Sequence, residues 1–237
     1  MNVLITGADR GLGLALTEKM LTQGFTVFAG QYLSSWGELE KLAAIYPDTL
    51  KIISLDVASD ASFIEAAKQV SNHTDKLDAI IGSAAIHGWN DDVVAEFTDT
   101  QMMTTVYNVN TIGNVRLVEH FLPLLKNGTT RKICFVSSEA GSTAESTRET
   151  HFWYTMTKTA LNHYAKILHN RLRKEDFKFR LYHPGWMKSY MHGEFINDVA
   201  TYEPSEAANF AFSYFFTDVV NEDELVLYTF DKKIMAF

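Results

Sequence analysis

A tyrosine and a lysine four residues apart, Tyr154 and Lys158, begin a stretch with apolar residues at helical spacing. Residues four apart lie on one face of a helix, so the ammonium group can lie near the phenol. A phenol ordinarily titrates near pH ~10, and a nearby positive charge favours the phenolate and lowers that pKa. The pair is therefore either a surface pair one helical turn apart or a proton donor with the cation that activates it.

Two further polar residues could complete an acid–base site. Ser138 follows a buried apolar run in ICFVSSEAGS, and Asn110 stands in YNVNTIGN, where asparagine is unfavourable in a helix unless its amide is bonded. A serine hydroxyl can hold a substrate carbonyl beside the phenol, and an asparagine can hold a water that relays protons. The four residues suit protonation of a carbonyl oxygen as a hydride arrives at its carbon. Spacing alone leaves Ser137 and Ser142 open as alternative serines.

A glycine-rich turn follows the first apolar run, in ITGADRGLGLAL. The spacing G-x-x-x-G-x-G allows a tight turn, a close approach to a pyrophosphate, and packing of a helix whose N-terminus faces the phosphates. Tight strand-to-helix turns need glycine in any case, but the position after the first strand favours nucleotide binding. The residues of this turn expected at a cofactor are Gly7, Asp9, Arg10, Gly11, Leu12 and Gly13.

A carboxylate, Asp56, stands with Val57 just after the third apolar run, in ISLDVAS. At the carboxyl end of a parallel strand it can accept a hydrogen bond from an adenine amino group. An equally good interpretation is that Asp56 or Ser59 caps the following helix.

The elements that must position these groups alternate along the chain. Short runs rich in β-branched residues occur at 3–5, 26–29, 50–55, 79–81, 132–136, 179–182 and 225–230. Helical patterns occur at 12–21, 36–45, 61–70, 104–125 and 154–172, and a short helix is expected from Pro204 to about 216. Repeated strand–helix units predict a mostly parallel sheet covered by helices on both faces. No linker or internal repeat interrupts the pattern, so residues 1–237 are expected to form one domain.

The composition narrows the class of protein. The formal net charge of −8 is spread along the chain, which argues against a nucleic acid or an anionic membrane as partner. The single cysteine, Cys134, permits no disulfide within the chain, and no leader or bilayer-length apolar run is present, so a cytoplasmic protein is expected. The eight histidines form no metal-binding motif, and His151 and His163 are interpreted as structural or surface residues.

Six segments occur in one order: TGADRGLG, LDV, the stretch around Asn110, VSSEAG, YTMTK and YHPGWMKS. They resemble the short-chain dehydrogenase/reductase family in its single-domain form, and HPGWMKS is similar to the C-factor-like and small carbonyl-reductase branch. The resemblance runs from the first strand to about residue 190, and in length to the C-terminus. It implies a doubly wound Rossmann fold with seven parallel strands, a nicotinamide cofactor, and a catalytic tetrad of Asn110, Ser138, Tyr154 and Lys158.

The same resemblance places further residues at the cofactor. Tyr154 and Lys158 would lie beside the nicotinamide ribose, which Lys158 would reach. The carboxamide would be surrounded by Pro184, Gly185, Met187 and Ser189, with Ser189 replacing the usual threonine.

The chain departs from the family pattern in two places. The fourth strand usually ends in Asn-Ala-Gly, but here Ser83, Ala84 and Ala85 stand at the adenosine side of the cofactor, and alanine takes a positive φ less readily than glycine. The spacing from Ser138 to Tyr154 is also a few residues longer than is common. The inserted residues, STAESTRETHF, are expected to bulge near the mouth of the substrate site.

The second strand bears on the choice between NAD(H) and NADP(H). Members of the family that bind NAD carry a carboxylate at its end, which repels a 2′-phosphate. Here Gln31 and Tyr32 are uncharged and Arg10 could contact the phosphate, so NADP(H) is favoured over NAD(H). The alternative is that Arg10 pairs with Asp9, or with nothing, in solvent.

The segment from about 190 to 216 is expected to form a substrate lid lined by His192, Phe195 and Tyr202. Its shortness favours a small or open pocket. An aromatic cluster at 210–216 is expected in the core and at an interface. The resemblance further implies a homodimer or homotetramer through two long helices at about 99–126 and 149–174.

The leading hypothesis is an NADP(H)-dependent reductase of small aldehydes or ketones, with Tyr154 as acid, Lys158 as activator, Ser138 holding the carbonyl and Asn110 holding a relay water. One alternative is a dinucleotide-binding regulatory or scaffold protein with little turnover, which the Ser83–Ala85 departure motivates. Another is an epimerase or dehydratase on the same fold.

Overall fold

The computed structural model describes residues 1–88, 99–191, 199–218 and 220–237. Within these residues, eight strands form one sheet in the order β3-β2-β1-β4-β5-β6-β7-β8. Their bounds are β1 (Asn2–Ile5), β2 (Thr26–Gln31), β3 (Leu50–Ser54), β4 (Ala79–Gly82), β5 (Lys132–Val136), β6 (Lys178–His183), β7 (Leu227–Thr229) and β8 (Ile234–Met235). The first seven strands are parallel to their neighbours, which confirms the doubly wound Rossmann fold.

The eighth strand is the difference from the seven expected. β8 returns antiparallel to β7, with Leu227 opposite Met235 and Tyr228 opposite Ile234. The turn between them places Lys232 at a φ of 63°, and the hydroxyl of Thr229 accepts the Lys233 amide at 2.9 Å. A two-residue strand is too short to show alternation, so the sequence carries no signal for it.

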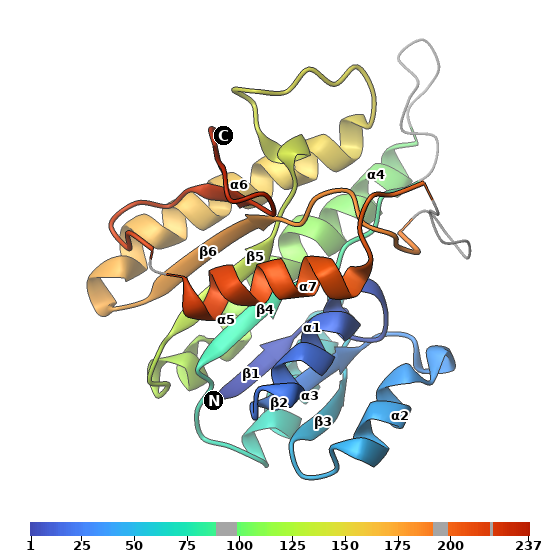
Figure 1. The fold of residues 1–237 in the computed structure, drawn as a ribbon, viewed down its shortest axis with the longest axis vertical. Helices are drawn as coiled ribbons and strands as arrows, with labels where there is room; N and C mark the ends of the chain where they lie inside the picture. Colours follow the sequence, from blue (N-terminus) through green and yellow to red (C-terminus); the bar gives the residue numbers. More distant parts are fainter. Residues whose placement is uncertain (89–98, 192–198, 219) are drawn as a thin grey trace.

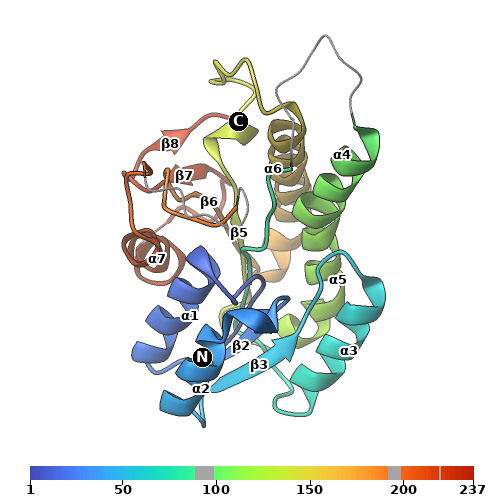
Figure 2. The same ribbon diagram turned by 90° about the vertical axis from the view of Figure 1, so that its right-hand side faces the viewer.

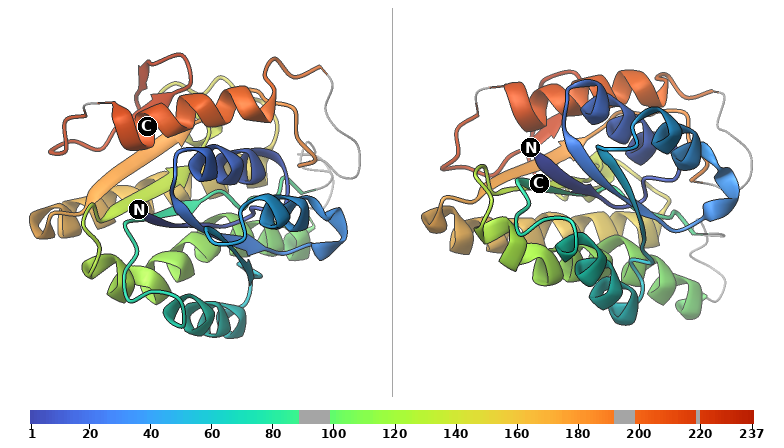
Figure 3. Two further views of the ribbon diagram at one scale, coloured as in Figure 1. Left: turned by 60° about the horizontal axis from the view of Figure 1, so that its bottom comes forward. Right: turned by 90° about the horizontal axis from the view of Figure 1, so that it is seen from below.

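Helices cover both faces of the sheet, which lies between two helical layers in Figure 2. One layer contains α1 (Gly11–Thr22), α2 (Glu38–Ile45) and α7 (Pro204–Phe212), and Figure 1 shows α7 lying beside α1. The other layer contains α3 (Asp60–Ser71), α4 (Thr100–Tyr107), α5 (Gly113–Lys126) and α6 (Phe152–Leu172). The views in Figure 3 show the same layers from the end of the sheet at which the N-terminus lies.

Two of the expected helices contain wider turns. The helical pattern at 104–125 is divided into α4, a π-helical turn η2 (Asn108–Ile112) and α5, and α7 continues into a second π-helical turn, η5 (Ser213–Thr217). Short 3-10 turns are η1 (Ser34–Trp36), η3 (Glu139–Gly141) and η4 (Arg173–Glu175). A π-helical turn inside an α-helix is frequently found at a functional site, and η2 contains Asn110.

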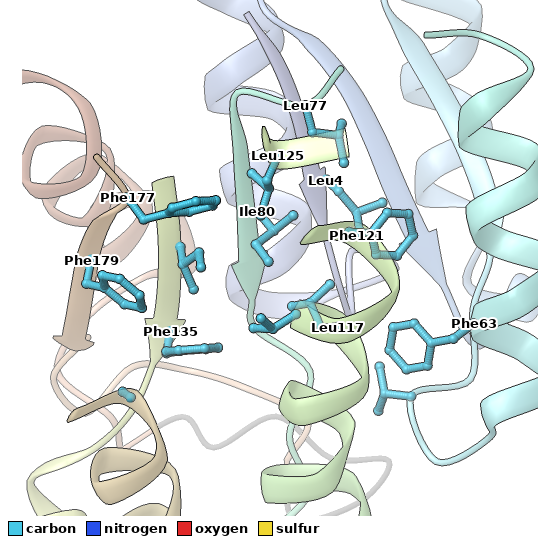
Figure 4. Close-up of a cluster of buried hydrophobic side chains, with 14 of the residues drawn as sticks. Leu4, Phe63, Leu77, Ile80, Leu117, Phe121, Leu125, Phe135, Phe177 and Phe179 are labelled. Carbon is cyan, nitrogen blue, oxygen red and sulfur yellow. The ribbon is translucent and has the colours of Figure 1, made fainter. Parts of the chain in front are cut away.

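Each face of the sheet has its own hydrophobic core. Between the sheet and α5, Leu117 and Phe121 pack toward Ile80 of β4 and Leu4 of β1, as Figure 4 shows. On the opposite face, residues of α1 and α7 pack with apolar residues of the same strands. Of the aromatic cluster at 210–216, the side chains of Phe212, Tyr214 and Phe215 are buried and belong to this second core.

None of the helices in the described part of the chain has the length and apolarity to cross a bilayer.

Candidate active site

The first residues of the site come from the turn between β1 and α1. Gly7 has a φ of 63°, and a Cβ on Gly13 would lie 2.0 Å from the carbonyl oxygen of Gly7. The turn therefore packs as the glycine spacing predicts, because no larger residue fits where the helix meets the strand. The first turn of α1 has no capping side chain and no acidic residue. The N–H groups of this first turn and the positive end of the helix dipole can therefore bind an anion.

A cavity of about 320 Å³ extends from this turn along the carboxyl ends of the strands. It is lined by every residue that the sequence predicts at the cofactor except Gly185. Gly185 has a φ of 78°, and a Cβ there would come within 2.7 Å of the Phe230 ring, so this glycine serves the packing of its loop. A second cavity of about 710 Å³ adjoins the first, since Arg10, Ile86, Thr105, Tyr190 and Met191 line both.

The glycine turn, the uncapped helix and the elongated cavity fit a dinucleotide. Sequence reasoning did not place several lining residues at the cofactor, none of which carries a charge that would single it out: Tyr32, Leu55, Ala58, Ile86, Thr105, Val109, Val136, Ser137, Tyr190 and Met191. Tyr32 is the most informative of these, because its ring is 64% exposed at the end of β2 and yet lines the cavity. An exposed aromatic ring at this position can stack on a planar base.

At the adenosine end, the structure separates the two interpretations of Asp56. The cap of α3 is Ser59, whose hydroxyl accepts the Ser62 amide at 3.2 Å. Asp56 instead accepts the amide of Ala58 at 2.8 Å and lines the cavity. Its carboxylate is therefore oriented by its own loop and lies where an adenine amino group could donate to it.

The turn after β4 accommodates its unusual sequence. The hydroxyl of Thr6 accepts the amides of Ser83 and Ala84, both at 3.1 Å, and so ties this turn to the end of β1. Among the described residues that are not glycine, positive φ angles occur at Arg131, His151, Asp176 and Lys232, so Ala85 needs no strained conformation. The alanines of this turn line the cavity without the cost that the sequence suggested.

Asp9 and Arg10 each have a different partner. The Asp9 carboxylate accepts the amide of Leu33 at 3.4 Å, while the Arg10 guanidinium lies 5.1 Å from the centre of the Trp36 ring. Trp36 in turn contacts the ring of Tyr190, at 4.6 Å between centroids. The alternative in which Arg10 pairs with Asp9 is therefore not what the structure shows. The stack holds Arg10 at the junction of the two cavities.

Tyr154 and Lys158 lie together at the other end of the cavity. The Lys158 Nζ donates to the carbonyl oxygen of Val136 at 2.9 Å and lies 5.6 Å from the centre of the Tyr154 ring. Burial, with a smaller contribution from the nearby Glu139 carboxylate, raises the pKa of Tyr154 to about 12. Burial also lowers the pKa of Lys158 to about 8. The expectation of a lowered tyrosine pKa is thus wrong for the cofactor-free protein, because desolvation exceeds the effect of the lysine.

The structure separates the three candidate serines. The hydroxyl of Ser138 donates to the Glu139 carboxylate at 2.5 Å and accepts the Ala140 amide at 3.1 Å, and it lies close enough to Tyr154 to lower the pKa of that phenol. Ser137 lines the cavity, but its hydroxyl donates to Asn162 at 2.5 Å, and the hydroxyl of Ser142 donates to the carbonyl oxygen of Ala236 at 2.5 Å. Ser138 is therefore the serine that the structure brings to the phenol.

Asn110 is fully buried, and both ends of its side-chain amide are bonded to the main chain of Ile86. It donates to the Ile86 carbonyl at 2.8 Å and accepts the Ile86 amide at 2.9 Å, and it also donates to Thr157 at 3.1 Å. These bonds join η2, the loop after β4 and α6. The side chain of Asn110 therefore fixes the backbone around Tyr154, and a relay water held by that side chain remains a prediction.

The insert before α6 returns to the site through Arg148 and His151. Arg148 donates to the carboxylate of Glu139, and its Nε lies 3.0 Å from the accepting oxygen. The Nδ1 of His151 lies 2.6 Å from the Nε2 of His87, whose ring stacks on Tyr154 at 5.0 Å between centroids. Sequence reasoning placed the insert near the site but missed Glu139 and His87. Their only signal is position, since Glu139 follows Ser138 directly and His87 follows the turn after β4.

Of the residues predicted to line a lid, His192 and Phe195 lie outside the described residues. Tyr202 packs its ring on that of Phe230, with centroids 4.7 Å apart, and pairs with Met187 through an isolated β-bridge.

Within the described part of the chain, no three metal-ligating side chains come together to form a possible metal site.

Comparison with known proteins agrees with this geometry. The family model of the short chain dehydrogenases matches residues 1–200. An uncharacterized oxidoreductase of Schizosaccharomyces pombe is 30% identical over 203 residues, which cover 84% of this chain and 79% of the relative. The 1-hydroxy-2-glutathionyl-2-methyl-3-butene dehydrogenase of a Rhodococcus species is 27% identical over 206 residues, or 87% of this chain and 86% of the relative.

Two solved structures extend the comparison to the whole chain. The NADPH-bound carbonyl reductase from chicken fatty liver has a TM-score of 0.87 at 27% identity, with 100% of this chain and 98% of that chain covered. The carbonyl reductase Sniffer of D. melanogaster has a TM-score of 0.86 and covers 100% of this chain and 99% of its own, but at 22% identity this likeness shows the fold alone.

Proposed function

This chain belongs to the short-chain dehydrogenase family and is an NAD(P)-dependent oxidoreductase, and from that premise we propose that it reduces small aldehydes or ketones to alcohols with NADPH. The observation that carries the proposal is the pairing of Tyr154 with Lys158 at the end of a cavity that begins at the glycine turn, with Ser138 beside the same phenol. The NADPH-bound carbonyl reductase from chicken is a supporting likeness.

The chain's own residues divide into two groups. The turn at Gly7–Gly13 and the N-terminus of α1 would hold the pyrophosphate, Asp56 the adenine, and Pro184, Met187 and Ser189 the nicotinamide carboxamide. When bound, the nicotinamide cofactor supplies the hydride that adds to the carbonyl carbon. Tyr154 gives its phenolic proton to the carbonyl oxygen, so the carbonyl becomes an alcohol and the tyrosine becomes a phenolate.

Lys158 and Ser138 support that proton transfer. A positive charge on Lys158, close to the ring, stabilises the phenolate that remains after the proton has left. Ser138 lies beside the phenol and lowers its pKa, so it favours the phenolate that the transfer leaves behind. Lys158 is buried and Tyr154 is partly buried, which strengthens both interactions.

The preference for NADPH is supported by charge. Arg10 is held at the cavity by its stacking on Trp36 and can donate to a 2′-phosphate. No carboxylate stands at the end of β2, where Gln31 donates to Glu40 and Tyr32 lines the cavity. Glu40 is not among the lining residues, so a 2′-phosphate beside Arg10 would meet no acidic group of β2.

The test is oxidation of NADPH, and in parallel of NADH, by the purified protein with a series of small aldehydes and ketones. Tyr154→Phe should lower kcat by about 10²–10⁴-fold and leave NADPH affinity almost unchanged, because only the phenolic hydroxyl is removed. Tyr164→Phe, on the same helix but outside the site, is the matched control and should keep full activity. Turnover that survives the Tyr154 change would refute the mechanism.

A dinucleotide-binding scaffold with little turnover predicts a different result. The scaffold hypothesis was based on the unusual sequence of the turn after β4. The hydrogen bonds from this turn to Thr6 show that it is well held, so they give the hypothesis no support. It would nevertheless be the conclusion if NADPH bound saturably and no carbonyl compound of the series were reduced.

We also propose a homodimer or homotetramer through the outer faces of α4, α5 and α6. Large apolar side chains are exposed on this layer, including Tyr107, Met156 and Ile167. Clustered exposed apolar groups of this kind commonly mark an interface. Light scattering after size exclusion should give a mass of two or four chains, and Ile167→Glu should reduce it.

A further inference from the structure

The ring of Tyr154 packs against a histidine that lies outside the two cavities. The imidazole of His87 stacks on the phenol ring, with an interplanar angle of 25° and centroids 5.0 Å apart. His87 is 8% exposed and is not among the residues that line either cavity at this site. It therefore contacts the tyrosine rather than the space that a substrate would occupy.

The loop that carries His87 is fixed on both sides of this histidine. The amide and the carbonyl of Ile86 are both bonded to the side chain of Asn110, at 2.9 and 2.8 Å. Gly88 has a φ of 91°, and a Cβ there would lie 2.9 Å from the side chain of Val106. A shift of this backbone would break two hydrogen bonds or a close packing contact, so the main chain of His87 is held in one place.

The imidazole of His87 is held in turn by His151, which ends the insert before α6. The Nε2 of His87 and the Nδ1 of His151 lie 2.6 Å apart, and the two rings meet edge to face with centroids 4.4 Å apart. Only one proton fits between two imidazole nitrogens, so one ring donates and the other accepts. The ring of His87 cannot rotate about its Cβ–Cγ bond without losing this hydrogen bond.

The backbone of His151 is an independent sign that this contact matters. Its φ of 66° and ψ of 44° are the left-handed conformation, which is uncommon in residues other than glycine. His151 is the N-cap of α6, yet its side chain makes no capping hydrogen bond to the helix. Left-handed residues of this kind persist where surrounding contacts fix them, and they cluster at functional sites. The bond to His87 is such a contact.

We propose that His87, held by His151, is a positioning residue for the reduction: it fixes the plane of the Tyr154 ring and thereby the place of the phenolic oxygen. The inference rests on the proposed function. The phenolic oxygen lies on the long axis of its ring, so rotation about that axis leaves it in place, whereas a swing of the ring toward one of its faces moves it. The stacked imidazole blocks the swing toward His87. Because a displacement of about 1 Å can cost about 10²-fold in rate, this support bears on kcat.

The first test compares variants that remove or keep the stacked ring. His87→Ala should lower kcat for carbonyl reduction about tenfold and change KM less, because the tyrosine is displaced and the substrate site is not altered. His87→Phe keeps a planar ring on the phenol and should recover most of that loss. His120→Ala is the matched control, because this imidazole stacks on Phe63 at 5.5 Å between centroids, outside the site, and its loss should leave kcat unchanged. Urea unfolding of each variant ensures that kcat is measured on folded protein.

A double-mutant cycle tests the part played by His151. His151→Gly removes the imidazole and adds no backbone strain, since glycine adopts the left-handed conformation readily. In the wild-type background this change should lower kcat about threefold or more, because the ring of His87 is no longer held. In the His87→Phe background, where the bond is already absent, it should leave kcat unchanged. Equal losses in the two backgrounds would show that His151 does not act through His87, and would overturn the proposal.

A measurement without substrate separates this inference from the proposed function. In protein with ¹³C-labelled tyrosine rings, the resonances that disappear in Tyr154→Phe belong to Tyr154. A stacked aromatic ring shifts the resonances of its neighbour, so His87→Ala should move them and His120→Ala should not. If they move but the wild type reduces no carbonyl compound, the proposed reaction fails and the support of the Tyr154 ring by His87 is confirmed. If the wild type reduces carbonyls and His87→Ala keeps a normal kcat, the positioning role fails alone.

Discussion

Replacing Lys158 with methionine should stabilise the cofactor-free protein and abolish its acid–base chemistry. The lysine is only 2% exposed, and burial lowers its pKa from 10.5 to about 8. One unit of pKa corresponds to about 1.4 kcal/mol, so the ammonium destabilises the folded state by about 3 kcal/mol when it is charged. Methionine has a similar length without the charge, but it leaves the Val136 carbonyl without its donor, which costs about 1 kcal/mol. The net gain expected at pH 7 is about 2 kcal/mol.

The sign of this effect with pH follows from proton binding. Below pH 8 the lysine is charged in both states, so the destabilisation of the folded wild type is complete. Between about pH 8 and 10.5 the unfolded chain keeps the proton and the folded chain has lost it, so the stability of the wild type rises with pH. The advantage of the variant should therefore shrink from pH 7 to pH 10.

The assay is urea unfolding of both proteins without cofactor at pH 7 and pH 10, followed by tryptophan fluorescence. Lys166→Met is the matched control, because it removes the same charge from a partly exposed position on the same helix and should show no such dependence on pH. A Lys158→Met protein that is less stable than the wild type at pH 7, or whose advantage is the same at both pH values, would refute the reasoning.

Three further changes test other parts of the site. Arg10→Met should weaken NADPH binding about tenfold or more and leave NADH binding unchanged, as measured by fluorescence titration. Gly13→Ala places a Cβ 2.0 Å from a carbonyl oxygen and should lower the free energy of unfolding by about 2 kcal/mol or more in urea titrations. Ser137→Ala should cost about 1–2 kcal/mol of stability by leaving the Asn162 Oδ1 without its donor, with turnover retained, whereas Ser138→Ala should lower turnover about 10²-fold.

The fold could be predicted from the sequence where the pattern is long. The expected helix at 154–172 is α6, Phe152–Leu172, and the strand at 132–136 is β5 with the same bounds. What escaped prediction is short or depends on geometry. β8 has two residues, and the π-helical turn at Asn108–Ile112 keeps a helical hydrophobic pattern, so neither alters the periodicity that sequence analysis reads.

The polar positions around the cavity were also predictable, because glycine spacing and strand ends fix where they meet. The partners of those residues were not. Thr6 supports the turn after β4, and Trp36 holds Arg10, through contacts between segments that lie 77 and 26 residues apart. No local pattern encodes such pairings. Asn110 illustrates the same limit, since no local pattern indicates that its amide bonds the main chain of Ile86.

The motif of Tyr154 and Lys158 was identified correctly, but the direction expected for the pKa shift of Tyr154 was wrong. Spacing of four residues places Lys158 on the correct helix face, but it does not determine the position of the ammonium group relative to the phenol. The Nζ bonds to the Val136 carbonyl and lies 5.6 Å from the centre of the ring, while burial and Glu139 both favour the protonated phenol. Burial also favours the neutral form of Lys158. The phenol is therefore protonated at neutral pH, and Lys158 loses its proton more readily than an exposed lysine does.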